Sequence, residues 1–205
     1  SSGDELRDPG DTLAPGAIFD ASRFALAAAL TQIGCAVTDL GIIRDDIDAI
    51  QIALAEAAAS HDFLITSGGM STGEEDYMKT AIESLGVLHF WRLAIKPGRP
   101  VALGQIDTQN GPVPFAGLPG NPVAAMVTFL VVARPLILRL SGATNVAPVC
   151  YRVCAGFAHR KKSNRREFVR AKIVAGEDGT PTAEKQGSSG AVSYTHLTLP
   201  TNREV

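Results

Sequence analysis

The sequence contains few cysteines and few aromatic residues, and its charges nearly cancel. Three cysteines occur among 205 residues, at positions that match neither a disulfide framework nor a zinc motif, so a reducing, cytoplasmic setting fits best. The formal net charge of −2 produces no overall field that would attract nucleic acid or a membrane surface. We therefore expect neither of these as a partner.

The sequence also lacks the signatures of membrane insertion and of export. No apolar run reaches the roughly 18–20 residues that a bilayer span needs, and residues 1–5 lack the charged-then-apolar pattern of a signal peptide. Hydrophobic residues make up 45% and charged residues 20% of the chain, as in an ordinary soluble globular protein. The length suffices for one domain of ordinary size plus part of another.

Residues 1–140 alternate between helical and strand patterns. Near-continuous apolar runs are typical of strands buried on both faces of a parallel sheet, and segments with helical spacing of apolar residues separate them. The expected helices are 18–33, 47–59, a segment ending at 85, and 123–140; the expected strands are 35–40, 62–66, 87–93, 101–106 and 113–116. The alternation predicts an α/β fold with three α/β/α layers around a mostly parallel sheet. The first strand of this sheet is expected to be missing, because no apolar strand precedes Ser1.

The pattern changes after Gly142. Residues 147–157 and 167–174 read as strands with polar turns and no helix. We predict one α/β domain over residues 1–143 and a partial small β domain over residues 144–191, too short to close a core alone. The basic run at 160–166 lacks the aromatic residues typical of nucleic-acid binding and is expected to be a solvated hairpin. Residues 192–205 resemble a translated sequencing-adaptor tail and are expected to be non-native.

The most informative segment is the Gly/Ser-rich loop at residues 66–76, between an apolar strand and an amphipathic helix. Backbone N–H groups in such a loop, together with the dipole of the following helix, bind oxyanions. The acidic residues at 74–76 fit a divalent cation placed between them and the anion. The loop therefore predicts a phosphorylated or otherwise oxyanionic small-molecule ligand and a metal.

Four carboxylates stand where loops or helices begin after expected strands. They are Glu5, Asp20, Asp45 and Asp76. Carboxylate oxygens that converge at the carboxyl edge of a sheet suit Mg²⁺. Two simpler interpretations stay open. Asp45 or Asp46 could be the N-cap of the helix at 47–59, and Asp76 could serve only the dipole of its own helix.

Cations and a rigid turn follow other expected strands. Arg92 and Lys96 are four residues apart, so they point the same way in an extended segment. Together with Arg99 they either neutralise a phosphate or a tetrahedral oxyanion or form a solvated face. The turn at 118–122 reads Leu-Pro-Gly-Asn-Pro. It either presents N–H groups to an anion or only starts the next helix, with Asn121 as the N-cap.

Six segments, in order along the chain, resemble the MoeA-type molybdopterin molybdenumtransferases, whose eukaryotic counterpart is the E region of gephyrin. The matching segments are 2–6, 16–20, 40–46, 66–73 with 76–77, 90–92 with 96–98, and 118–122. Residues 165–168 and 186–188 resemble the C-terminal β domain of that family more faintly. Six motifs in family order with matching spacing make the resemblance specific, although each motif alone is weak.

The resemblance implies an enzyme of molybdenum cofactor biosynthesis. Such enzymes take adenylylated molybdopterin and molybdate, release AMP and insert the metal into the dithiolene, with Mg²⁺ as cofactor. By this resemblance the catalytic residues are Asp45, Asp76, Lys96 and Arg92, and the metal ligands are Glu5, Asp45 and Asp76. The residues implied to bind the cofactor are Ser67, Gly68, Gly69, Ser71, Gly73, Asp20, Pro119, Gly120, Asn121, Arg165 and Ser188. Family members act as dimers, so a homodimer is expected for the full-length protein.

Other functions stay open beside this one. The adenylyltransferase that makes the adenylylated pterin shares the sheet and the Ser-Gly-Gly loop, and a nucleotide-processing family reuses the same domain. The 96–98 loop, the 118–122 turn and the β segment favour the molybdenumtransferase. A gephyrin-like peptide-binding scaffold is the alternative outside enzymes, since fold alone does not decide function. No Cys, Ser or Lys has an obvious neighbouring base, so no covalent enzyme intermediate is expected.

Overall fold

A four-stranded sheet forms the centre of residues 1–143 in the computed structural model, which describes residues 1–69, 77–160, 162–176 and 179–186. Across the sheet the strands are β3 (Leu64–Ser67), β7 (Gly111–Leu118), β6 (Pro100–Thr108) and β4 (Gly86–Arg92). β3 and β7 run parallel, whereas β6 is antiparallel to both of its neighbours. The expected strands at 62–66, 87–93, 101–106 and 113–116 are therefore present.

The α/β class is confirmed, but the sheet is mixed instead of mostly parallel. One of its three strand pairings is parallel. The reason lies in the connections, because parallel neighbours need a crossover of a dozen or more residues. Only residues 109–110 separate β6 from β7, and residues 93–99 separate β4 from β6, so these strands can pair only in opposite directions.

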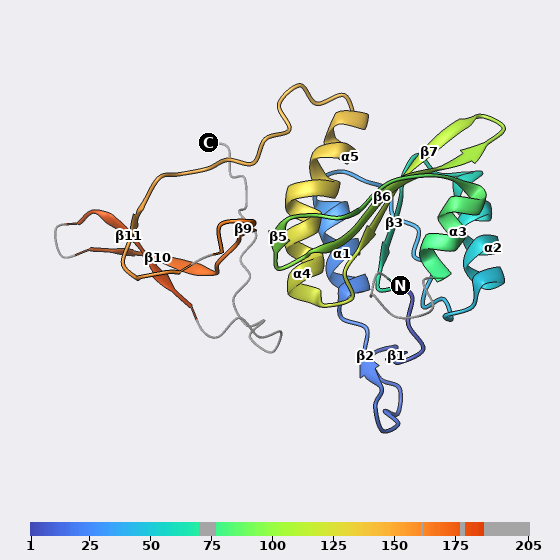
Figure 1. Cartoon of the computed structure of the whole chain (residues 1–205), viewed down its shortest axis with the longest axis horizontal. Coiled ribbons are helices and arrows are strands. Elements are labelled where there is room, and N and C mark those ends of the chain that lie inside the picture. The colour runs from blue at the N-terminus through green and yellow to red at the C-terminus, as the bar shows by residue number, and fades with distance from the viewer. Residues whose placement is uncertain (70–76, 161, 177–178, 187–205) are drawn as a thin grey trace.

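Helices cover both faces of the sheet, which gives the expected three layers (Figure 1). On one face, α2 (Ile47–Ala58) and α3 (Tyr77–Leu85) enclose a core that includes Ile50, Met78, Ile82 and Phe115. On the other face, α1 (Ser22–Gln32) and α4 (Pro122–Thr128) enclose a second core with Leu30, Leu118 and Phe129. Removing these side chains from water is the main favourable term in folding this part of the chain.

The expected helix at 123–140 is one long helix with an irregular middle. It consists of α4, the π-helical turn η1 (Phe129–Ala133) and α5 (Arg134–Leu140). Pro135 lacks the N–H that would continue the α-helical ladder, and the wider turn directly before it accommodates this gap. At its start, the side-chain oxygen of Asn121 accepts hydrogen bonds from the N–H groups of Val123 and Ala124, at 3.1 and 3.2 Å.

The same helix corrects the expectation that no segment is long and apolar enough for a bilayer. Residues Pro122–Leu140 pass that test by length and composition. The expectation counted uninterrupted apolar runs and so missed a helix in which arginines and prolines are spaced among apolar residues. In the structure Ala125, Phe129, Ala133 and Ile137 pack into the core beside the sheet, as the apolar stripe of a core helix does.

The helix starts are fixed by local hydrogen bonds. Asp46 is the N-cap of α2, since its carboxylate accepts a hydrogen bond from the N–H of Ala49 at 2.8 Å. The first expected helix begins at Ser22 instead of residue 18, because β2 (Ile18–Phe19) pairs in parallel with β1 (Leu6–Arg7). Gly34 follows the end of this helix with φ of +90°, as expected for a residue that stops a helix.

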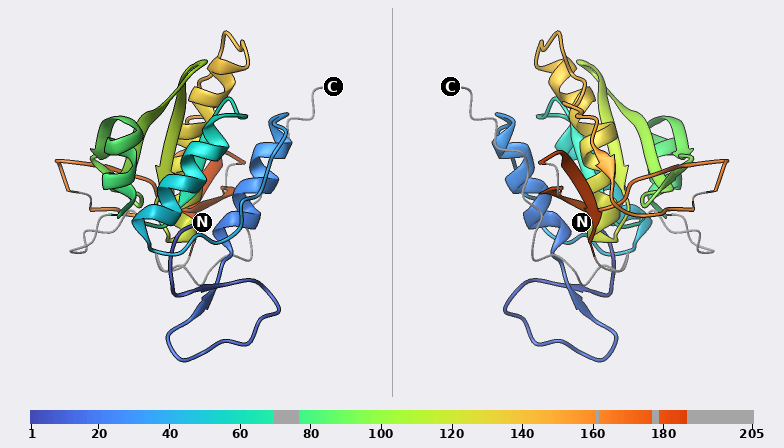
Figure 2. Two further views of the ribbon diagram at one scale, coloured as in Figure 1. Left: turned by 90° about the vertical axis from the view of Figure 1, so that its right-hand side faces the viewer. Right: turned by 90° about the vertical axis from the view of Figure 1, so that its left-hand side faces the viewer.

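The strand expected at 35–40 is absent from the described structure. This segment has no regular secondary structure and pairs with no strand. Instead the Asp39 carboxylate accepts a hydrogen bond from Arg23 of α1 at 2.8 Å and another from the N–H of Gly41 at 2.9 Å. An ion pair thus ties Asp39 of this segment to α1. Residues 6–19, with β1 and β2, extend away from the sheet (Figure 2).

Residues 144–186, which we call the β tail, contain short strands and no helix in the described part. β8 (Cys154–Ala155), β11 (Pro181–Lys185) and β10 (Ala171–Ala175) form a three-stranded sheet, and β9 (Arg166–Glu167) pairs with β5 (Ile95–Lys96) of the α/β part. The strands expected at 147–157 and 167–174 are thus shorter and shifted. Val149 and Tyr151 are exposed, so no second layer stabilises a longer strand there.

Candidate functional site

The carboxyl ends of three strands lie at one edge of the central sheet, which we call the rim. β3 ends at Ser67, β7 at Leu118 and β4 at Arg92, and β6 begins at the same edge with Pro100. Adjacent strands are about 4.8 Å apart, so β3 and β4 are separated by roughly 14 Å across the sheet. The three loops singled out in the sequence therefore start from one edge, which in α/β sheets is where ligands bind.

The first residues of the chain lie against the end of β3. Ser2 forms bridges with Ile43 and Gly68, and its N–H donates to the carbonyl oxygen of Ser67 at 3.0 Å. The hydroxyls of Ser1 and Ser67 lie 3.1 Å apart. Ser2 is buried, so its backbone is one wall of the rim. The sequence marked residues 2–6 as a segment that resembles the family but did not predict this contact, which joins residues 66 positions apart.

Asp45 and Asp46, which the sequence could not distinguish, have different tasks. Asp46 caps α2, whereas the Asp45 carboxylate accepts hydrogen bonds from the Ser2 hydroxyl at 2.7 Å and from the Asp4 N–H at 3.3 Å. The N–H of Asp45 donates in turn to the Asp4 carboxylate at 3.2 Å. These bonds fix Asp45 beside the end of β3. The N-cap interpretation thus applies to Asp46 alone.

The loops after β3 and β7 meet through glycine. Gly68 has φ of +89°, and a Cβ on it would lie 2.1 Å from the carbonyl oxygen of Ser2. The Gly68 N–H donates to the carbonyl oxygen of Leu118 at 3.1 Å, and a Cβ on Gly120 would contact the Gly68 Cα at 3.4 Å. Gly69 also has a positive φ, of +65°. Only glycine allows this close approach of two backbones.

The turn at 118–122 serves as the start of a helix in the described structure. Pro119 is buried, Gly120 is exposed, and the Asn121 side chain caps α4 as described above. The Gly120 carbonyl oxygen accepts a hydrogen bond from the Ser22 hydroxyl at 3.3 Å, which joins this turn to α1. The helix-start interpretation is therefore confirmed for Asn121, and a contact of these residues with a ligand stays a prediction.

Asp20 lies in an ionic cluster behind the rim. Its carboxylate is 1% exposed and accepts hydrogen bonds from the Nε of Arg23 at 3.2 Å and from the N–H of Arg23 at 3.1 Å. Arg23 also pairs with Asp8 and Asp39. Although partial burial raises the pKa of Asp39, the hydrogen bonds from Gly41 and Arg23 outweigh it and lower that pKa. Asp20 thus helps to fix Arg23, which joins Asp8, Asp20 and Asp39.

The loop with Lys96 lies on α4. Gly98 has φ of +99°, and a Cβ on it would lie 2.3 Å from the Thr128 Cγ2, so the loop packs closely on this helix. Arg92, Lys96 and Arg99 are all exposed. Arg92 ends β4 and Lys96 ends β5, which places both cations on the β4 side of the rim, while Asp45 lies on the β3 side.

The β tail adds further charged groups beside Lys96. Glu167 is directly opposite Lys96 in the β5–β9 pair. Its carboxylate accepts a hydrogen bond from the Nε of Arg165 at 2.7 Å and lies 3.1 Å from the Nε2 of His159. The bond from Arg165 is the main reason that the pKa of Glu167 falls to about 2, with smaller contributions from His159 and from the charge of Lys96. The sequence predicted Arg165 as a site residue but did not predict Glu167 or His159 as one.

The predicted metal ligands and the remaining predicted site residues divide between the rim and the part of the chain outside the described residues. Ser71, Gly73, Asp76 and Ser188 lie outside the described residues. Of the predicted metal ligands, Asp45 and Glu5 are both at the rim; a Cβ on Gly3 would lie 2.6 Å from the Glu5 Oε2, so this carboxylate folds over Gly3, next to Ser2. Within the described ranges, no three His, Cys, Asp or Glu side chains form a group that could hold a metal ion.

One buried hydroxyl at the rim has no hydrogen-bond partner within the described part of the chain. It is the Oγ1 of Thr66, next to Ser67 in β3. A buried polar group without a partner costs about 1–3 kcal/mol. Because this oxygen is buried, it is an unsatisfied polar group inside the end of β3 and not a group on the surface of the rim.

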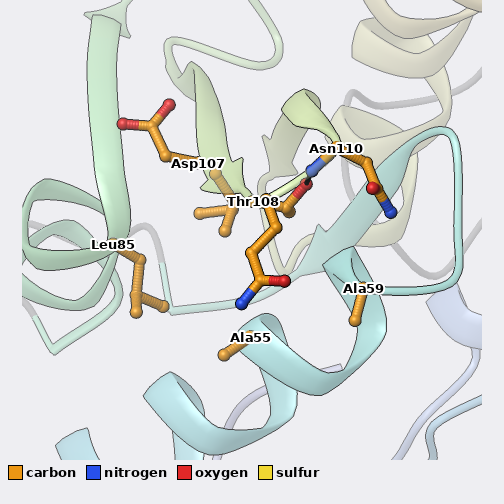
Figure 3. A pocket seen from close by; sticks show the side chains of 8 residues that line it. Ala55, Ala59, Leu85, Asp107, Thr108 and Asn110 are labelled. Atoms are coloured by element: carbon orange, nitrogen blue, oxygen red, sulfur yellow. Dashed lines mark hydrogen bonds between the residues drawn. The ribbon is translucent and has the colours of Figure 1, made fainter.

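A hollow of about 380 Å³ lies at the opposite end of the sheet (Figure 3). It is lined by Ala55, Ala59, Leu85, Ile106, Asp107, Thr108, Gln109 and Asn110. These residues belong to the ends of α2 and α3 and to the hairpin between β6 and β7. None of the predicted site residues lies there, so this hollow is separate from the rim.

Comparisons with known proteins agree with one another. Residues 3–139 match the family model described as "Probable molybdopterin binding domain". The chain is 37% identical over 192 residues to a "Molybdopterin molybdenumtransferase" of Haemophilus influenzae, covering 93% of this chain and 46% of that protein. It is 38% identical over 143 residues to the protein of the same name from Nostoc sp., covering 69% of this chain and 33% of that protein.

A solved structure supports the same relationship. The molybdopterin biosynthesis MoeA protein from Pyrococcus horikoshii superposes with a TM-score of 0.71 at 30% identity, covering 93% of this chain and 45% of that one. The similarity includes the β tail, because the covered share exceeds residues 1–143. The chain spans about half the length, or less, of the proteins that it matches.

Proposed function

Because this chain belongs to the molybdopterin-binding domain family, we propose that the protein takes part in molybdenum cofactor biosynthesis as a molybdopterin molybdenumtransferase. In this reaction adenylylated molybdopterin and molybdate are the substrates, AMP is released, and the metal enters the dithiolene of the pterin. The observation that carries the proposal is the rim, where Asp45, the Ser67–Gly69 backbone and the cation Lys96 lie at one edge of one sheet.

The β3 side of the rim suits the phosphate end of the pterin. Gly68 is buried against Ser2, but Gly69 is partly exposed and carries no side chain, so a phosphate can approach its backbone closely. The hydroxyl of Ser67 lies at the end of β3, 3.1 Å from the hydroxyl of Ser1. Hydroxyl and N–H donors of this kind bind phosphate oxygens well.

Mg²⁺ fits the carboxylates present on this side. Mg²⁺ is usually bound by one or two carboxylates together with substrate phosphates, and Asp45 and Glu5 flank Ser2 and Gly3 at the end of β3. These two residues would hold the ion, with Asp76 as the third predicted ligand outside the described residues. When bound, Mg²⁺ would neutralise charge on the phosphoanhydride as it is split. The chain's own contribution is to orient Asp45 through Ser2 and Asp4.

The β4 side of the rim suits molybdate. Arg92 and Lys96 provide two cations for a doubly charged tetrahedral anion, and Arg165 lies beside Lys96 through the β5–β9 pair. Guanidinium groups bind oxyanions through several N–H donors, and lysine does so as a point charge. The separation of roughly 14 Å between β3 and β4 leaves room for a pterin between the phosphate end and the anion.

Two further features of the proposal concern the setting of the protein. We propose a homodimer and a cytoplasmic location, as in the family that the sequence resembles. The cysteines Cys35, Cys150 and Cys154 are all free thiols, which fits a reducing compartment.

Binding of adenylylated molybdopterin to this chain, measured by calorimetry with and without Mg²⁺, tests the proposal. We expect Asp45→Asn to weaken Mg²⁺-dependent binding at least about tenfold, the effect of one lost charge-assisted interaction. Asp48→Asn, an equal charge change at an exposed position in the first turn of α2, is the matched control and should bind normally. Equal affinities for the two variants would contradict the assignment of Asp45.

The rival functions give different results in the same assay. An adenylyltransferase would bind ATP and non-adenylylated molybdopterin together, with the same dependence on Asp45. A peptide-binding scaffold would bind its peptide equally well in the Asp45→Asn and Asp48→Asn variants. Either pattern, with no binding of the adenylylated pterin, would replace the molybdenumtransferase as the function.

A further inference from the structure

The strand pair β5–β9 fixes the Lys96 segment to the β tail (Figure 1). The N–H of Arg166 donates to the carbonyl oxygen of Ala94 at 2.9 Å, and the N–H of Phe168 donates to the carbonyl oxygen of Lys96 at 2.8 Å. These bonds lie on either side of Glu167, which is directly opposite Lys96. The backbone of Lys96 is therefore positioned by a segment about seventy residues away in the sequence.

Glu167 is a carboxylate in an enclosed place. Its side chain is 7% exposed, although most of the β tail is open to solvent. A carboxylate in such a place is costly unless cations and donors surround it. Here Arg165 donates from its Nε at 2.7 Å, and the Nε2 of His159 lies at 3.1 Å from the other oxygen.

Each of these bonds sets a direction. A bond to the Nε of Arg165 fixes the plane of the guanidinium, because the group is rigid and planar. The bond to His159 comes from a residue eight positions earlier, so it also fixes the chain before β9. Lys96 adds its positive charge to that of Arg165 close to the same carboxylate. The cluster has more positive than negative charge, so it keeps an attraction for anions.

We propose that Glu167 is the positioning residue of an oxyanion subsite. Its carboxylate holds Arg165 beside the Lys96 strand, which the backbone bonds of Arg166 and Phe168 hold in place. In this arrangement the cations of Arg165 and Lys96 face a tetrahedral dianion such as molybdate. The inference rests on the proposed function for the identity of the anion. The role of Glu167 itself follows from its two oxygens, which are shared between Arg165 and His159, and from its register opposite Lys96.

The main test compares Glu167→Gln with Glu184→Gln. Both remove one carboxylate charge from the β tail, but Glu184 is exposed on β11. Calorimetric titration with molybdate, and with tungstate as a second dianion, should show at least about tenfold weaker binding for Glu167→Gln. Adenylylated molybdopterin should bind both variants within about twofold of the wild-type chain, because the β3 side is unchanged. Wild-type affinity for molybdate in Glu167→Gln would overturn the proposal.

A second measurement separates this inference from the proposed function. The Nε–H proton of Arg165, bonded to a carboxylate, should exchange slowly with solvent and give a distinct signal in NMR spectra. If the wild-type chain binds no molybdate, the proposed substrate is wrong, and this signal alone decides the positioning role. Loss of the slow exchange in Glu167→Gln, with retention in Glu184→Gln, supports the role; retention in both overturns it.

A conservative variant covers the case in which Glu167→Gln fails to fold. Glu167→Asp keeps the charge but is shorter by one methylene, so it cannot reach Arg165 and His159 together. We expect molybdate binding to weaken about threefold while the melting temperature stays close to that of the wild-type chain. A purely structural role for Glu167 would instead change melting without changing affinity, and that outcome would count against the proposal.

Discussion

The α/β part of the chain (residues 1–143) and the β tail (residues 144–186) are held together by different forces. Among the described residues, 23 of the 24 buried hydrophobic residues lie in the α/β part, and Ala183 alone lies in the tail. The α/β part carries 9 Lys and Arg against 16 Asp and Glu, whereas the tail carries 9 against 4. The α/β part is therefore acidic and has two hydrophobic cores, whereas the β tail is basic and buries almost no hydrophobic side chain.

This difference assigns the two sides of the rim to different parts of the chain. The side with Asp45 and Glu5 belongs wholly to the acidic part and is supported by packed helices. The side with Lys96 gains Arg165 and His159 from the basic tail, through one short strand pair and one carboxylate. Changes to cores should therefore affect stability most, and changes to polar contacts in the tail should affect affinity most.

The largest expected effect comes from the core of the α/β part. Phe115 is 1% exposed at the centre of β7, and Phe115→Ala should lower the free energy of unfolding by about 3–5 kcal/mol. Ile173→Ala in the tail, where the side chain is exposed, should change it by less than about 0.5 kcal/mol. Urea unfolding of both variants measures the contrast. Similar losses would show that the tail has a core of its own.

The next effect concerns the backbone contact below the rim. Gly68→Ala should cost about 2–3 kcal/mol, because it combines a left-handed φ with a Cβ placed 2.1 Å from the Ser2 carbonyl oxygen. Gly16→Ala has almost the same φ, +87°, but no neighbour within 4 Å, and should cost only about 1 kcal/mol. Chemical denaturation compares the two. An equal cost would mean that Ser2 moves aside freely.

A smaller effect separates the adjacent aspartates. Asp46→Ala removes the N-cap of α2, which should reduce stability by about 1 kcal/mol and leave ligand affinity unchanged. Asp45→Ala should do the reverse, with weaker binding of adenylylated molybdopterin and a smaller change in unfolding. Thermal melting and calorimetry on the two variants measure this split. If Asp46→Ala weakens binding more than Asp45→Ala, the assignment of the pair is reversed.

The smallest effect is the response of the tail to acid. The pKa of Glu167 lies at about 2 in the folded protein and at 4.5 without its partners. A carboxylate with a lowered pKa stabilises the fold above the higher value, and this contribution is lost as the pH falls from about 4.5 toward 2. The protection of backbone amides in the Lys96 segment against hydrogen exchange, relative to the intrinsic exchange rate at each pH, should therefore decrease as the pH falls over that range. This decrease should be absent in Glu167→Gln and present in Glu184→Gln.

The parts of this structure that were predictable from sequence are the ones determined by near neighbours. The helix caps at Asp46 and Asn121 depend on N–H groups two or three residues away. Apolar runs in the sequence indicate the buried strands. The α/β class and the gathering of loops at one edge follow from these elements.

Most of the predictions that were wrong or incomplete concern features that depend on residues distant in the sequence. The segment at 35–40 has the composition of a strand, but in the structure Asp39 forms an ion pair with Arg23 of α1. No local sequence pattern predicts this ion pair. The direction of β6 follows from its short connections to β4 and β7, which the expectation of a mostly parallel sheet did not take into account. Ser2 and Glu167 were missed because their importance arises only when residues 67 and 96 become their neighbours. For Glu167, a single acid between Arg165, Arg166 and Arg170 was the available signal.

The meeting of Gly68 and Gly120 has a consequence for how this protein could change its preference for ligands. Where two main chains touch, no side chain is present to be exchanged, so the surface between β3 and β7 offers the same shape and the same donors whatever the rest of the sequence becomes. Discrimination between one pterin and another, or between one oxyanion and another, must then depend on the side chains that surround this glycine contact. Efforts to change ligand preference should begin with those side chains.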